Sequence, residues 1–148
     1  VKPDGWQAKA IRNTVIDFGS VNELFEKAEH THSKLILDML KKLVNSEFTN
    51  ILERQFGIGW GNRFEAQSLR FISVYKDCGG HEADALEHLL ITRVLRKGKV
   101  LGRYDISIDK LKDLKSALSK MFKSINGTAT KAIEIIESEI TRKEEGVY

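Results

Sequence analysis

The sequence predicts a mainly α-helical fold, a multi-helix bundle with one short N-terminal strand and a C-terminal helical hairpin. Its 148 residues are 41% hydrophobic, which is enough for one domain with a packed core. The single proline, Pro3, lies near the start, so helices can run long after it. Apolar residues recur at i, i+3 and i+4 through much of the chain. We therefore expect residues 1–148 to form a single helical domain.

The first elements are a strand and a helix. Thr14–Phe18 is β-branched and aromatic, which favours a short strand. A strand alone leaves its backbone unpaired, so it either pairs with a sheet outside this chain or is not a strand. Ser20 and Glu23 have the spacing of a capping box, which predicts a helix from about Val21. A break is expected at His30–His32.

The middle of the chain predicts two further helices. The apolar rhythm of Ser33–Phe56 indicates a helix with a kink near Asn45. Gly57–Gly61 is expected to be a loop, because alternating glycines weaken regular structure. Asn62 is a suitable N-cap for the next helix, and Gly79–Gly80 would end it.

Three helices are expected in the C-terminal half. The first spans about Glu82–Arg96, and the second begins after Ser107 as its N-cap. Asn126–Gly127 predicts a tight turn into a last helix over Thr128–Glu144. The short turn predicts that the last two helices fold back as an antiparallel hairpin.

Charge and cysteine content restrict the function classes. The net charge of +3 is compatible with phosphate or nucleic acid nearby, but it is more typical of a solvated lysine-rich surface. One cysteine, Cys78, excludes an internal disulfide and predicts a cytoplasmic location. No apolar run approaches the roughly 20 residues that span a bilayer, so we expect no membrane partner. The chain begins with Val1, which favours a piece of a longer protein.

The glycine loop and the residues after it form the first candidate site. The loop lacks the Gly-Lys-Ser/Thr ending of a P-loop. A plain interhelical turn with Trp60 packed in the core would also explain it. Arg63 favours a phosphate contact beside Asn62, because a cation at a helix start is unfavourable unless an anion lies opposite.

A basic cluster forms the second candidate site, and it consists of Arg93, Arg96, Lys97, Lys99 and Arg103. These residues could contact phosphates of a nucleotide or DNA. They could equally be the solubilising end of a helix, where cations suit the dipole. No metal site is expected, since neither His30 with His32 nor Cys78 with His81 has further ligands at site spacing.

Gly61–Lys97 resembles the C-terminal lid of AAA+ ATPases, most closely the McrB-like GTPases of modification-dependent restriction systems and their MoxR-like relatives. The residues that carry the resemblance are Asn62-Arg63-Phe64, Leu69-Arg70-Phe71-Ile72, Ala85-Leu86-Glu87 and Arg93-Val94-Leu95-Arg96. The resemblance implies that Arg63 is a nucleotide-sensing arginine. The resemblance continues from Lys97 to about Phe122.

Ile11–Phe18 resembles the segment that leaves the ATPase core in that family. Arg12 would then be a second nucleotide-sensing residue that reaches a neighbouring subunit, although Ile11 stands where the family has an acidic residue. The resemblance divides the chain into residues 1–19 at the edge of a core, 20–60 as N-terminal helices, and 61–148 as lid-like helices with the hairpin.

The chain contains no P-loop and no strand ending in paired acids for Mg²⁺. The resemblance therefore implies a fragment that is inactive alone and binds no cofactor by itself, while the parent hydrolyses ATP or GTP with Mg. The implied partners are the remainder of the ATPase, neighbouring subunits of a ring, a nuclease subunit and DNA. The alternative is a non-enzymatic helical module that binds DNA or protein through the hairpin and the basic cluster.

Overall fold

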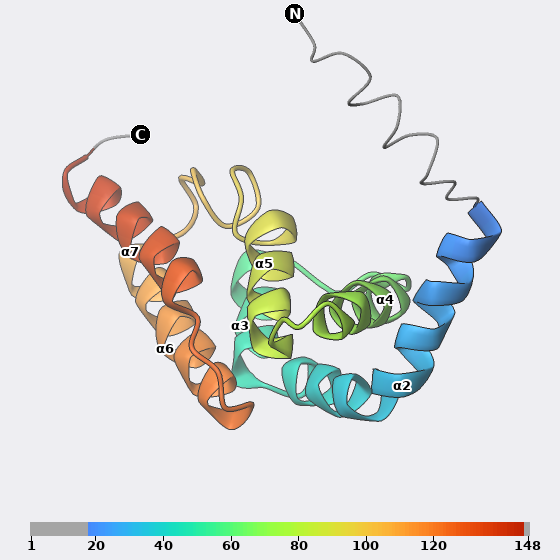
Figure 1. Cartoon of the computed structure of the whole chain (residues 1–148). Helices are drawn as coiled ribbons and strands as arrows, with labels where there is room; N and C mark the ends of the chain where they lie inside the picture. Colours follow the sequence, from blue (N-terminus) through green and yellow to red (C-terminus); the bar gives the residue numbers. More distant parts are fainter. Residues whose placement is uncertain (1–17, 147–148) are drawn as a thin grey trace, which may run out of the picture.

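The computed structural model describes residues 18–146, and this part of the chain forms helices and no β-strand (Figure 1). The helices are α2 (Phe18–Val44), α3 (Glu47–Phe56), α4 (Phe64–Asp77), α5 (Glu82–Arg93), α6 (Ile108–Ser124) and α7 (Thr130–Glu144). The predicted mainly helical bundle is confirmed. Of the predicted strand, Thr14–Asp17 lie outside the described residues, and Phe18 is helical.

The hairpin of α6 and α7 lies at one end of the molecule and α2 with α4 at the other, with α3 and α5 between them (Figure 1). Helices α6 and α7 pack side by side and run in opposite directions, so the predicted antiparallel hairpin is confirmed. One continuous core joins the two ends, because every helix contributes buried apolar side chains to it. Its largest fully buried members include Ile36, Leu43, Phe48, Leu52, Ile72, Leu86, Leu90, Leu111, Leu114, Leu118 and Phe122.

Helix α2 runs unbroken for 27 residues, so both the predicted start at Val21 and the predicted break at His30–His32 are wrong. Helix α2 packs along α4, and one of the contacts near the predicted break is the hydrogen bond that Glu29 accepts from Arg70 of α4 at 2.6 Å. The helix does end where a kink was predicted. Ser46 there caps α3, and its hydroxyl accepts a hydrogen bond from the backbone N–H of Thr49.

The turns between the later helices lie where the sequence predicts them, with shifted boundaries. Gly79 has a φ of +94°, which suits glycine and follows the end of α4. Ser107 caps α6 as predicted. The helix predicted over Glu82–Arg96 ends at Arg93, because the chain turns there and places Val94 in the core.

The turn before α7 brings the hairpin against α5. Asn126 has a φ of +57°, and α7 begins two residues later than predicted, at Thr130. A Cβ atom on Gly127 would lie 2.5 Å from the Cβ of Ala83 in α5. Only a glycine therefore lets this turn approach the start of α5 so closely.

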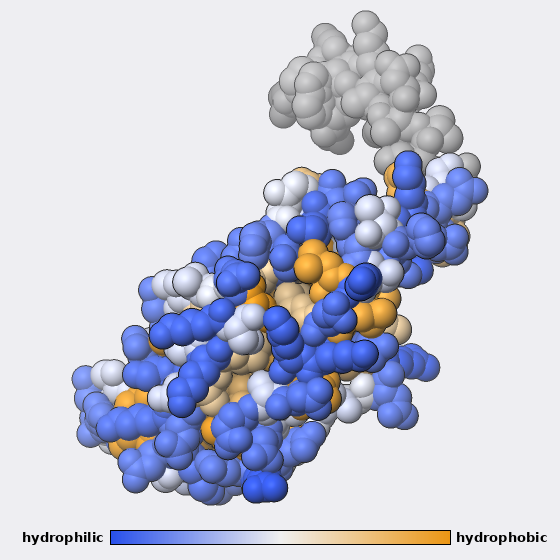
Figure 2. Space-filling view, turned by 90° about the horizontal axis from the view of Figure 1, so that it is seen from below, coloured by the Kyte–Doolittle hydropathy of each residue, from blue (hydrophilic) through white to orange (hydrophobic). Residues whose placement is uncertain are grey.

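Hydrophilic side chains cover most of the face seen from below, and hydrophobic atoms are visible in a hollow near its middle (Figure 2). No helix within residues 18–146 has the length and apolar character needed to cross a membrane. The exposed large apolar side chains include Phe18 and Leu24 of α2 and Tyr104 before α6. Single exposed apolar residues of this kind are ordinary in proteins.

Candidate functional site

The glycine loop is fixed to the core by its aromatic residue. Gly57 closes α3 in the left-handed conformation, with a φ of +67°. The Nε1–H of Trp60 donates a hydrogen bond to the buried Thr49 hydroxyl at 3.1 Å. The indole ring also stacks on the Phe64 ring, with 4.4 Å between centroids. Trp60 is half-buried, so the loop is an anchored turn that keeps part of the indole accessible.

Arg63, and not Asn62, occupies the N-cap of α4, so the predicted cap is wrong. Arg63 makes no side-chain capping bond, because a guanidinium has no acceptor to offer to the helix N–H groups. By contrast α3, α5 and α6 are capped by the side chains of Ser46, His81 and Ser107. Helix α4 therefore begins with a cation at the positive end of its dipole.

A cavity of about 200 Å³ lies beside this helix start and gathers three of the predicted cations. Arg63 comes from the N-cap of α4, Arg93 from the last turn of α5, and Lys99 from the turn that follows α5. All three are exposed. Residues 58–61 of the glycine loop form another wall. We call this cavity the cationic pocket.

Gln67 links two walls of the cationic pocket. Its side-chain oxygen accepts a hydrogen bond from Nη1 of Arg93 at 2.6 Å. The bond holds the guanidinium of α5 against α4, where both residues line the cavity. Concentrated positive charge at a concave surface attracts anions more strongly than scattered charges do. The pocket is thus suited chemically to a phosphate or another small polyanion.

The remaining predicted contacts lie outside the lining of the cationic pocket. Asn62, Arg96 and Lys97 are exposed, and the latter two lie in the turn that also carries Lys99. Arg12 lies outside the described residues. The structure therefore brings together Arg63, Arg93 and Lys99 from the predicted set and adds Gln67.

Arg103 also stands apart, because its side chain is bonded within the chain. Its Nη1 donates to the carbonyl oxygens of Phe56 at 2.6 Å and Lys99 at 3.0 Å. Its Nε and Nη2 donate to the two carboxylate oxygens of Asp105. The hydrogen bond with Asp105 raises the pKa of Arg103, and the bond from Arg103 lowers the pKa of Asp105.

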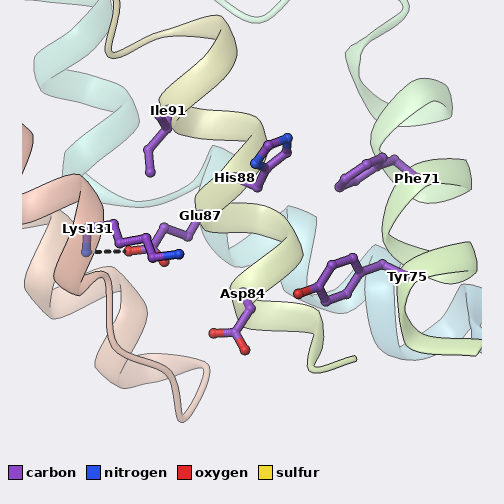
Figure 3. Close-up of a pocket in the computed structure, with 7 residues that line it drawn as sticks. All are labelled: Phe71, Tyr75, Asp84, Glu87, His88, Ile91 and Lys131. Atoms are coloured by element: carbon purple, nitrogen blue, oxygen red, sulfur yellow. Dashed lines mark hydrogen bonds between the residues drawn. The ribbon is translucent and has the colours of Figure 1, made fainter. Parts of the chain in front are cut away.

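The start of α7 forms a second polar centre, shown in Figure 3. Glu87 projects from α5, and its carboxylate accepts hydrogen bonds from the backbone N–H groups of Lys131 and Ala132 at 3.0 and 3.2 Å. Its side chain is buried, with 8% of its surface exposed. Ala129 at the N-cap has no side-chain bond to offer. Glu87 therefore caps α7 from another helix.

A larger cavity of about 630 Å³ surrounds this cap. Phe71 and Tyr75 of α4 face His88 and Asp84 of α5 across it (Figure 3). The imidazole of His88 stacks on Phe71, with centroids 5.7 Å apart. The cavity is lined by two carboxylates, Asp84 and Glu87. Because Glu87 is hydrogen-bonded to the backbone of α7, the two do not form a free pair for acid–base chemistry. Within residues 18–146 no three metal-ligating side chains come together.

Comparisons with protein-family models, curated proteins and solved structures returned no match for this chain.

Sequence reasoning overlooked Glu87, Gln67 and the bonded state of Arg103. Glu87 had the pattern of an exposed acid on a helix, and its partners lie 44 and 45 residues further along the chain. An N-cap position without a capping side chain, here Ala129, was the available signal that another element supplies the acceptor. His81 was considered as a metal ligand, whereas its Nδ1 caps α5.

Proposed function

We propose that this chain is a helical lid region that contacts the terminal phosphate of a nucleotide through Arg63. The observation that carries the proposal is the convergence of Arg63, Arg93 and Lys99 on one pocket from three separate elements. In this role Arg63 would act electrostatically on developing phosphate charge, while Arg93 and Lys99 hold the anion beside it. The nucleotide itself would be held by a separate ATPase core.

Because the chain resembles McrB-like and MoxR-like AAA+ proteins, we infer that this separate core is an AAA+ ATPase core of that kind. The proposed parent hydrolyses ATP or GTP with Mg in a ring of subunits, works with a nuclease on DNA, and is cytoplasmic. The α4 start supports the proposal, since it presents an arginine where the starts of α3, α5 and α6 present capping acceptors. An arginine in that place suits an anion brought by a partner.

The test is made on the parent protein. We expect the reading frame upstream of Val1 to encode a P-loop about 100–200 residues earlier, a typical domain length. In that protein Arg63→Ala should slow nucleotide hydrolysis about a hundredfold, the scale for one electrostatic donor. The folding of the chain should be unchanged, because Arg63 is exposed. Absence of a P-loop, or an unchanged turnover rate, would reject the proposal.

A second candidate function is DNA binding through the same cations, and the position of two residues favours it. Arg96 and Lys97 are exposed in the same turn as Lys99, which lines the cationic pocket, and they add positive charge outside the cavity. Duplex DNA would then bind with an affinity that falls steeply with salt, by a slope near 0.9 per phosphate contacted. Loss of that binding in Arg96→Gln with Lys97→Gln would favour DNA, whereas a nucleotide contact depends on Arg63.

A further inference from the structure

We propose that Arg103 is the positioning residue of the cationic pocket and does not itself contact phosphate. It ties the end of α3 to the turn that carries Lys99, and so fixes the distance between two walls of the pocket. This inference rests on the function proposed above. It also changes the role that the sequence predicted for Arg103, which was a direct phosphate contact.

The hydrogen bonds of Arg103 support a positioning role. A guanidinium has five N–H donors, and four of them are engaged with Phe56, Lys99 and Asp105. Phe56 is the last residue of α3, directly before the glycine loop. Lys99 supplies one cation to the pocket. A single side chain therefore joins the backbone of both segments.

Asp105 holds Arg103 in this geometry. Its two carboxylate oxygens accept from Nε and Nη2 in a bidentate pair. That pair orients the guanidinium, so that Nη1 points to the two carbonyl oxygens. Asp105 itself is largely exposed, with 66% of its side-chain surface accessible, so it can be replaced without disturbing the core.

Helix α7 fixes the backbone on which Arg103 sits. The buried Glu139 accepts a hydrogen bond from the N–H of Gly102 at 3.0 Å. Lys143, one turn further along α7, donates to the carbonyl oxygen of Arg103 at 2.6 Å. Helix α7 thus holds the backbone at Gly102 and at the carbonyl of Arg103, which keeps this attachment point fixed relative to the hairpin.

The two roles of Arg103 predict opposite effects of Asp105→Asn. If Arg103 were a phosphate ligand, this change would release its guanidinium and remove a negative charge nearby, and anion affinity would rise. If Arg103 is a positioning residue, the loss of the bidentate pair lets the turn at Lys99 shift, and affinity falls. The removal of a negative charge near the pocket cannot by itself lower the affinity for an anion.

The experiment measures binding of tripolyphosphate to the whole chain. Trp6→Phe leaves Trp60, a lining residue of the pocket, as the only tryptophan of the two in the chain. Its fluorescence and the ³¹P signal of the probe both follow the titration. We expect Asp105→Asn and Arg103→Lys to weaken binding about three- to fivefold, the scale of one partly exposed pair interaction. Asp113→Asn, at an exposed carboxylate of α6, is the matched control and should change nothing.

Arg63→Gln in the same background separates the two claims. If the chain does not bind tripolyphosphate, or if Arg63→Gln leaves the affinity unchanged, the cationic pocket is no phosphate site, and the proposed contact of Arg63 with phosphate fails together with this inference. If Arg63→Gln weakens binding while Asp105→Asn tightens it or leaves it unchanged, only the positioning role is overturned. An affinity in Arg103→Lys equal to that of the unsubstituted Arg103 chain would also overturn the positioning role, because a lysine cannot form the bidentate pair.

Discussion

Helices α4 and α7 both begin at a residue whose side chain makes no capping hydrogen bond, Arg63 in one and Ala129 in the other. At α7 the chain supplies a carboxylate from within, since Glu87 reaches across from α5. At α4 the chain supplies cations, which line a pocket at the helix start. The start of α7 is therefore completed within the chain and serves stability, whereas the start of α4 is suited to an anion from outside the chain.

Glu87→Ala should give the largest effect, because it removes the internal carboxylate at α7. Two charge-assisted bonds to backbone N–H groups are lost, so we expect the free energy of unfolding to fall by about 2–3 kcal/mol. Urea denaturation measures the change. Glu87→Gln keeps one oxygen acceptor and should cost less, while Glu134→Ala at an exposed site of α7 should stay within about 0.5 kcal/mol. Equal effects of Glu87→Ala and Glu134→Ala would refute the capping role.

Gly127→Ala should weaken the same helix start by moving it away from α5. The added methyl would overlap Ala83, so we expect a loss of about 1–3 kcal/mol in unfolding free energy. Gly59→Ala is the matched control, because a Cβ there meets nothing within 4 Å and the backbone has no positive φ. A Gly127→Ala variant as stable as Gly59→Ala would show that the turn can move without cost.

Acid should weaken the Arg103–Asp105 pair beside the cationic pocket. We expect this loss of stability to be smaller than the losses in Glu87→Ala and Gly127→Ala. The hydrogen bond from Arg103 lowers the folded-state pKa of Asp105 below its ordinary value near 3.8. The pair therefore stabilises the fold above that value, and its contribution is lost as the pH falls through the lowered pKa. Unfolding followed between neutral pH and about pH 3 should show a steeper loss in the wild type than in Asp105→Asn. Parallel curves would mean that the pair contributes nothing.

The parts of the fold that depend on local pattern were predictable, and those that depend on distant contacts were not. The i, i+3, i+4 rhythm predicted the helices. The residue types themselves predicted the Asn126–Gly127 turn and the cap at Ser107, and all of these signals lie within a few residues of each other. Helix α2 packs along α4, and one contact between the two helices, the Glu29–Arg70 bond, joins residues that are 41 positions apart. No local pattern reports such a contact.

For the candidate site, the individual cations were predictable from the sequence, but their arrangement in space was not. Arg63 was predicted from its place at a helix start, and Arg93 and Lys99 were predicted as members of the basic cluster. Their convergence depends on how α4, α5 and the following turn pack, which the sequence does not state. Arg103 looked like another free cation, since its partner Phe56 lies 47 residues earlier in the chain.

The most direct test of the contrast between the two helix starts is a residue-resolved titration of the ¹⁵N-labelled chain with tripolyphosphate. We predict that the amide signals of Glu65 and Ala66, in the first turn of α4, shift with the anion and lose that response in Arg63→Gln. The amide signals of Lys131 and Ala132 should stay in place, because Glu87 already binds them. Shifts at α7, or none at α4, would contradict the account.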